Sequence, residues 1–178
     1  MAGCANCLIT STICKACRET VGGLKNAYVL AGEISGTTID AGGSITSFSG
    51  SGTWFQFELE RNTSNFTETI NASLENGTVF YQQDLNLVFN KLQATTRAQL
   101  RLLSKCSSLR VAIETNDGTW FMLGLDYGMA VSAGTADTGL TFGDRNGYTI
   151  TLTGFEKEPA REITTDLDTA TTMTITEC

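Results

Sequence analysis

Cysteine is the residue type in this chain that could do chemistry most directly. The first 17 residues contain four of the six cysteines in a Cys-x2-Cys-x6-Cys-x2-Cys pattern, namely Cys4, Cys7, Cys14 and Cys17. Paired Cys-x-x-Cys units can bind a tetrahedral Zn²⁺ through four thiolates, although the central spacing is shorter than in most zinc sites. The same cysteines could form disulfides after release from a reducing cytosol, or stay free in an unmetallated arm. The pattern leaves these three alternatives open.

The two remaining cysteines are isolated in the sequence. Cys106 shares the apolar side of the helix expected over residues 91–106 with Leu100 and Leu103, so we predict a small buried hydrophobic residue there. Cys178 is the last residue, and we predict an exposed thiol.

Histidine is absent from the sequence. Its absence removes the usual general acid and base, the commonest neutral metal ligand and the Ser-His and Cys-His nucleophile systems. Carboxylate pairs remain, but the acidic residues are scattered, and the sequence has no Gly-rich phosphate loop or nucleophile elbow. We therefore predict that the protein is not an enzyme. We assign it no catalytic residue, no cofactor and, with the four clustered cysteines left open, no metal ligand.

Length and composition suit one domain of short strands and tight turns, because the 178 residues include 18 Gly, a single Pro and many Thr. The net charge of −7 argues against tight binding to DNA or RNA, which needs clustered Lys and Arg. The sequence has no apolar run of about 18 residues, and Lys15, Arg18 and Lys25 interrupt the region where a signal peptide would be apolar. We expect a soluble protein that is made inside the cell and has no membrane partner.

Strict alternation marks the strand that follows the Asn146-Gly147 turn. Tyr148, Ile150 and Leu152 share one face of this strand, and threonines occupy the other. Pro159 should end the strand, because it cannot donate a hydrogen bond to the next one.

Two further turns predict hairpins. Asn76-Gly77 separates the expected strands 65–74 and 78–90, in a hairpin long enough to project from a compact domain. Asp117-Gly118 joins the expected strands 108–115 and 119–125. Another strand is expected at 53–61, whereas the Gly/Ser/Thr-rich segment 35–52 is expected to be a connection outside the core, and 134–139 a mobile loop.

One helix is expected, over residues 91–106, with an apolar face and a solvated basic face. The basic face consists of Arg97, Arg101 and Lys105. The predicted fold is therefore mainly β, an antiparallel β-sandwich or barrel with long β-hairpins and one α-helix. We divide the chain into a cysteine-rich N-terminal arm (1–25), the β domain (26–160) and an extended C-terminal tail (161–178).

Four segments resemble virion structural proteins of tailed bacteriophages, of the tail-tube type, and most of all those of crAss-like and other Bacteroidetes-infecting phages. The resemblance covers about residues 53–160. The segments are Phe57–Thr63, Leu74–Tyr81, Leu87–Leu92, and Gly143–Tyr148 continuing through Lys157–Pro159. The cysteine-rich arm and the Thr-rich tail depart from that family's usual pattern.

The resemblance implies that six subunits assemble into a ring, that rings stack, and that the long hairpins join into an inner barrel around a channel for DNA ejection. It implies a location in the phage tail, after synthesis in the host cytoplasm, with other tail and head-tail proteins as partners. DNA would pass without specific binding. Four residues on polar strand faces are candidates for the channel wall, and an ordinary solvated face would account for each equally well: Glu58, Glu60, Gln82 and Asp84.

Two alternatives remain. The subunit could belong to a tail hub or to a ring at the head-tail junction instead of the repeating tube. A protein of another class, a carbohydrate- or receptor-binding β-sandwich, could stack Trp54 or Trp120 on a sugar ring. Aromatic residues at alternating strand positions usually belong to the core, however.

Overall fold

The chain is mainly β, as the sequence predicts, with antiparallel strands dominating both of its sheets. The structure, a computed structural model, describes residue 13 and residues 20–178. The predictions for Cys4, Cys7, Cys14 and Cys17 therefore lie outside the described residues. The elements are β1 (Leu24–Ile39), β2 (Ile45–Glu58), β3 (Asn65–Ser73), β4 (Thr78–Asn90), α1 (Ala94–Leu103), β5 (Arg110–Thr115), β6 (Trp120–Leu123), β7 (Met129–Asp137), β8 (Gly147–Glu156), β9 (Arg161–Ile163), α2 (Leu167–Ala170) and β10 (Thr174–Thr176).

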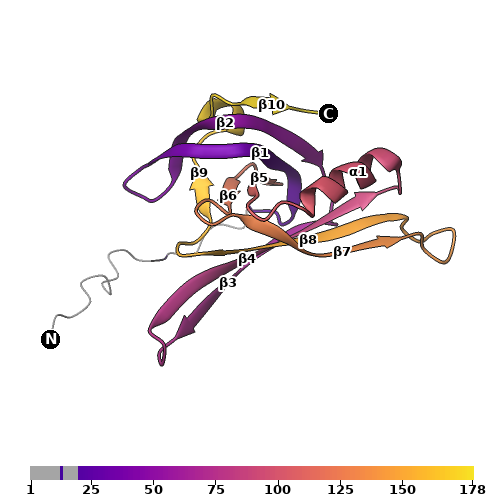
Figure 1. Cartoon of the computed structure of the whole chain (residues 1–178), viewed down its shortest axis with the longest axis horizontal. Helices are drawn as coiled ribbons and strands as arrows, with labels where there is room; N and C mark the ends of the chain where they lie inside the picture. Colours follow the sequence, from indigo (N-terminus) through magenta and orange to yellow (C-terminus); the bar gives the residue numbers. More distant parts are fainter. Residues whose placement is uncertain (1–12, 14–19) are drawn as a thin grey trace.

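The first sheet closes into a small barrel. Its strands pair in the order β1, β5, β6, β9 and β2, and β2 pairs back with β1. The short strand β10 also lies against β2, parallel to it. Side chains fill the interior, including Tyr28, Leu30, Ile45, Phe48, Trp54, Trp120, Met122, Ile163, Leu167 and Met173. Figure 1 shows β1 and β2 curving over the other strands.

The second sheet, in the order β3-β4-β8-β7, packs against the outside of the barrel. Neighbouring residues of the barrel strands consequently belong to different cores: Val29 faces the second sheet and Leu30 faces the barrel interior. A strand buried on both faces has a nearly continuous apolar sequence. The core between the sheets contains Ala27, Val29, Leu85, Leu87, Val111, Ile113, Leu123, Met129, Ile150 and Leu152.

Glycines allow β1 and β2 to curve and to approach each other closely. A Cβ atom at Gly32 would lie 1.9 Å from the carbonyl oxygen of Ser51, and one at Gly52 would lie 2.3 Å from that of Ala31. The expectation that residues 35–52 form a connection outside the core is therefore wrong. The segment continues β1, turns and begins β2, and its Ile45 and Phe48 are buried in the barrel.

Two hairpins extend the second sheet in opposite directions, which Figure 1 shows as the β3–β4 and β7–β8 arms. The predicted turn at Asn76-Gly77 is confirmed, with Gly77 at φ +63°. Residues 134–137, expected in a mobile loop, instead continue β7 and pair with β8. The strand predicted at 144–158 is confirmed as β8, although β8 begins only at Gly147 and ends at Glu156, three positions before Pro159.

The predicted amphipathic helix is present but shorter, spanning Ala94–Leu103. Leu100 and Leu103 pack against the core between the sheets, although no residue of α1 is fully buried. Cys106 lies beyond the helix and is exposed, so the prediction of a buried thiol is wrong. Cys178 is exposed, as predicted. No helix in the described part of the chain combines the length and apolarity needed to cross a membrane.

The C-terminal segment differs most from expectation, because residues 161–178 are not an extended tail. Strand β9 pairs with β6 and β2, the one-turn helix α2 follows, and β10 pairs with β2. The apolar residues of this segment are buried in the barrel: Ile163, Leu167, Ala170 and Met173. The segment closes the barrel and also supplies part of its core.

Candidate functional site: an uncovered sheet face with two free edges

The second sheet has one face against the barrel and one face that the described residues leave uncovered. We call the latter the open face. At one end of the open face lie the exposed rings of Phe80 and Phe155. The strand registers also place ten polar or small residues on it, all half-buried or exposed: Thr67, Thr69, Gln82, Asp84, Asn86, Ala133, Thr135, Thr149, Thr151 and Thr153. None of these residues is Lys or Arg. Arg145, in the β7–β8 connection, reaches the rim of the face, where its guanidinium donates to the Thr149 hydroxyl at 2.7 Å.

Asp84 supplies the negative charge at the middle of the open face. Its carboxylate accepts a hydrogen bond of 2.8 Å from the Gln82 amide and one of 2.6 Å from the Thr153 hydroxyl. Both donors are neutral, so the charge of Asp84 stays uncompensated by a cation. A surface of this kind repels phosphate and offers nothing for a polyanion to bind.

The structure separates the four residues that the sequence proposed for a channel wall. Gln82 and Asp84 lie together on the open face. Glu58 is the last residue of β2, and Glu60 lies in the turn that follows, so neither belongs to the second sheet. These two glutamates line a groove beside the end of β4 instead.

Within residues 20–178, the outer edge of β3 and most of the outer edge of β7 are free. The exception is Met129, the first residue of β7, which exchanges two backbone hydrogen bonds of 2.8 Å with Leu109. Each strand is nine residues long, and the three antiparallel pairings between them make the two edges antiparallel to each other. They are also staggered. The middle residue of β3, Thr69, lies at the level of Gln82, whereas the middle residue of β7, Ala133, lies at the level of Asn86, four residues further along β4.

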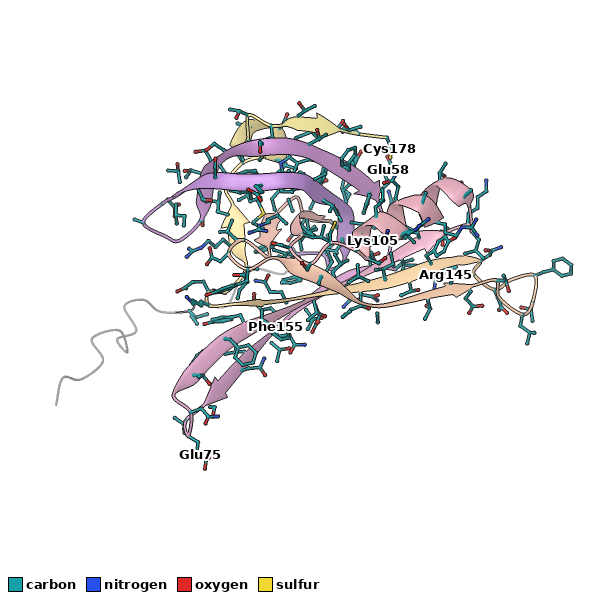
Figure 2. All side chains as sticks on the ribbon, in the orientation of Figure 1. Glu58, Glu75, Lys105, Arg145, Phe155 and Cys178 are labelled. Carbon is teal, nitrogen blue, oxygen red and sulfur yellow. The ribbon has the colours of Figure 1, made fainter. Side chains whose placement is uncertain are left out.

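Large apolar side chains are exposed on both projecting hairpins. On the β3–β4 arm and the adjoining end of β8 they are Ile70, Leu74, Val79, Phe80 and Phe155, with the rings of Phe80 and Phe155 in an edge-to-face contact at 5.9 Å. On the β7–β8 arm they are Leu140 and Phe142. In Figure 2, Glu75 and Arg145 mark the two arms at opposite ends of the sheet. Exposed apolar groups of this size are typical of protein–protein contacts.

The sequence analysis did not single out these apolar residues. The sequence does contain a sign of their exposure. Each group adjoins a turn marked by Gly and Asn, where an apolar side chain has little chance of burial. Trp54 and Trp120, the candidates for stacking on a sugar, lie in the barrel core and are only 0% and 8% exposed. They present no ring face to solvent.

The buried ionisable groups lie away from the open face and serve the fold. Burial raises the pKa of the Glu156 carboxyl, although its oxygens accept hydrogen bonds from the backbone N–H groups of Tyr127 (3.0 Å) and Asp126 (3.3 Å). Burial, together with the nearby Glu114 carboxylate, raises the pKa of Tyr28 to about 12. Among the described residues, no group of three or more His, Cys, Asp and Glu side chains could bind a metal ion.

No protein-family model, no curated protein and no solved structure matches the chain.

Proposed function

We propose that this protein is a structural, non-enzymatic subunit of a phage virion, a tail-tube protein whose copies assemble into stacked, six-membered rings around a DNA channel. The observation that carries the proposal is the second sheet, with its largely polar open face and two outer strands that run in opposite directions and have mostly free edges. The resemblance of segments within residues 53–160 to tail-tube proteins supplies the identity of the assembly and the number six.

Rotation of one copy relative to the next would bring β7 of one subunit beside β3 of its neighbour. Because the edges run antiparallel, β7 of one copy can pair with β3 of the other with Ala133 opposite Thr69. The pairing would involve the part of β7 that follows Met129, since Met129 is already bonded to Leu109. This register keeps both open faces on the same side. Such pairing satisfies the backbone groups that a free edge leaves exposed.

The stagger between the two edges supports a closed ring. Each added subunit shifts the strands by the four residues that separate Gln82 from Asn86 along β4. A closed barrel needs a cumulative shift of this kind, because its strands tilt relative to the axis. An unstaggered sheet of the same length would not supply it.

The open face would then form the channel wall, since the small barrel and α1 occupy the other face. The wall would present Asp84, Gln82 and threonine hydroxyls to DNA, which would pass without adhering. The subunit would reside in the tail of the virion after synthesis in the host cytoplasm, in contact with other tail and head-tail proteins. A tail hub or a junction ring would use the same sheet in a single ring.

Electron microscopy and mass photometry of the purified chain over a range of concentrations test the proposal. We expect six-fold rings with a central channel at high concentration. Stacks of rings would indicate the repeating tube, and single rings a hub or junction. A chain that stays monomeric at every concentration would contradict the proposal.

Cross-linking tests the edge pairing directly. We would mix a Thr67→Cys chain with a Thr135→Cys chain, oxidise the mixture, and identify linked peptides by mass spectrometry so that native cysteines do not confuse the result. The proposed register places Thr67 opposite Thr135 of the neighbour. Thr149→Cys is the matched control, because Thr149 lies opposite Thr135 but on the inner strand β8. We expect the Thr67–Thr135 link and no Thr67–Thr149 link.

A further inference from the structure

The connection between β7 and β8, residues 138–144, has a defined conformation that presents two apolar side chains to solvent. The Asp144 carboxylate accepts hydrogen bonds from the backbone N–H groups of Leu140 (2.8 Å) and Thr141 (2.7 Å), and that of Asp137 accepts one from Gly139 (2.9 Å). Leu140 is 95% exposed and Phe142 is 114% exposed. Removing such side chains from water is favourable, so a partner surface that covers them would form a stabilising contact.

A groove that could accept these side chains lies at the other edge of the second sheet, on the side of β3. It has a volume of about 500 Å³ and lies between the segment Glu58–Arg61, the end of β4 and the start of α1. Most of its lining is polar, and Leu59, Val88 and Phe89 contribute a smaller apolar part. The groove is open because β3 begins at Asn65, opposite Asn86, and so leaves the last residues of β4 without a neighbouring strand on this side.

We propose that the 138–144 loop of one copy inserts Leu140 and Phe142 into this groove of the neighbouring copy. The inference rests on the proposed edge pairing, and the register of that pairing leads to it. With Ala133 opposite Thr69, Asp137 lies opposite Asn65 of the neighbour. A strand rises about 3.3 Å per residue, and the connection after Asp137 is turned, so Leu140 lies at most about 10 Å beyond Asn65. Residues 88–90 of the neighbour's β4 are within that reach.

Charged side chains flank both the loop and the groove. The loop and its flanks carry Asp137, Asp144 and Arg145, and the groove carries Glu58, Glu60 and Arg61. Each surface therefore has two carboxylates and one cation, so the two surfaces are not complementary in net charge. The ion pair of the described residues joins Lys25 to Glu114, so Arg61 has no carboxylate partner within the described chain and is free to pair with a carboxylate of the inserted loop.

A mixed cross-linking experiment tests this contact. One chain would carry Phe142→Cys and the other Gln93→Cys, because Gln93 lines the groove on its exposed side. The control pairs Phe142→Cys with Lys105→Cys, which lies past the other end of α1. We expect a Phe142–Gln93 peptide link in assembled protein at concentrations where rings form, and none for the Lys105 variant.

A second variant separates assembly from folding. Replacing both exposed residues, Leu140→Ser and Phe142→Ser, removes no contact within the monomer, so thermal unfolding of the monomer should be unchanged. Assembly should require a concentration higher by roughly 100- to 10,000-fold, because two apolar side chains no longer become buried.

The outcomes distinguish this inference from the proposed function. If the Thr67–Thr135 link forms but the Phe142–Gln93 link does not, or if the serine variant assembles at the native concentration, the loop contact is wrong while the ring stands. If neither link forms, the edge pairing itself is wrong and the loop contact falls with it.

Discussion

The hydroxyl of Thr153 donates a hydrogen bond of 2.6 Å to the carboxylate of Asp84, directly across the pair of strands β4 and β8. The bond lies in the middle of the open face, where Asp84 also accepts from Gln82. It fixes a negatively charged carboxylate on the surface that we propose as the channel wall.

Replacing Asp84 with Lys should change how assembled rings interact with DNA. Each ring would gain one cation per subunit on the wall, and the contacts would release counterions from DNA. We expect variant rings to retain double-stranded DNA at low salt and to release it as salt increases, whereas native rings retain none. Co-sedimentation over a salt series measures this. The control is Glu75→Lys at the tip of the β3–β4 arm (Figure 2), where a single charge lies away from the open face. Equal retention by both variants would contradict the assignment of the wall.

Gly52→Ala should destabilise the small barrel. Gly52 has φ +128°, which side chains rarely adopt, and its added Cβ would lie 2.3 Å from the Ala31 carbonyl oxygen. We expect the free energy of unfolding to fall by about 2 kcal/mol or more. Gly22→Ala is the control, because a Cβ there has no neighbour within 4 Å. Urea denaturation monitored by tryptophan fluorescence reports the barrel, and equal losses for the two variants would argue against the close approach of β1 and β2.

The local parts of this fold were predictable from the sequence. The alternation of Tyr148, Ile150 and Leu152 and the Asn76-Gly77 turn depend on neighbouring residues alone, so the strand β8 and the β3–β4 hairpin follow from the pattern. The same alternation placed Gln82 and Asp84 on a common polar face. It failed for Glu60, because β2 ends at Glu58 and the residues that follow have no sheet to face.

The parts that failed depend on contacts distant in sequence. Ile45 and Phe48 are isolated among Gly, Ser and Thr, and only closure of the barrel buries them. Ile163, Leu167 and Met173 show no regular period, because a strand, a helical turn and a bend place them in the same core. The exposed edges of β3 and β7 were likewise unpredictable, since a single sequence does not reveal the order of strands in a sheet.

Gln83→Leu should destabilise the contact between the two sheets. Gln83 is buried. Its side-chain oxygen Oε1 accepts a hydrogen bond from the backbone N–H of Gly124 at 3.0 Å, and its side-chain nitrogen Nε2 donates one to the Glu68 carboxylate at 3.2 Å. Leucine would fill the space but leave both partners without this hydrogen bond. We expect a loss of about 1–3 kcal/mol in the free energy of unfolding.

The neighbouring residue provides the control for this substitution. Gln82→Leu changes the same side chain one residue away, on the half-exposed open face, and should cost much less. Urea denaturation of both variants makes the comparison, and a loss for Gln82→Leu as large as that for Gln83→Leu would show that the buried hydrogen bonds are not the cause.

Glu156 should make the stability of the monomer depend on pH. Burial raises the pKa of its carboxyl above the ordinary value of 4.5, so the folded state binds the proton more tightly than the unfolded state. The contribution of Glu156 to the free energy of unfolding is fully present below about pH 4.5 and is lost as the pH rises through the folded-state pKa. In Glu156→Gln this loss disappears. Relative to the native chain, the variant should therefore gain stability as the pH rises from about 4 to 7.

Urea denaturation at several pH values measures this relative gain, which does not depend on the absolute stability of the variant. The absolute value should be lower at every pH, because an amide offers one acceptor oxygen where the carboxylate accepts from both Tyr127 and Asp126. Glu162→Gln, at an exposed position of β9, is the control and should leave the pH dependence of the native chain in place. If Glu156→Gln and the native chain lose stability in parallel across this range, the pH dependence arises elsewhere. The buried carboxyl would then be charged and fully stabilised by the two backbone N–H groups.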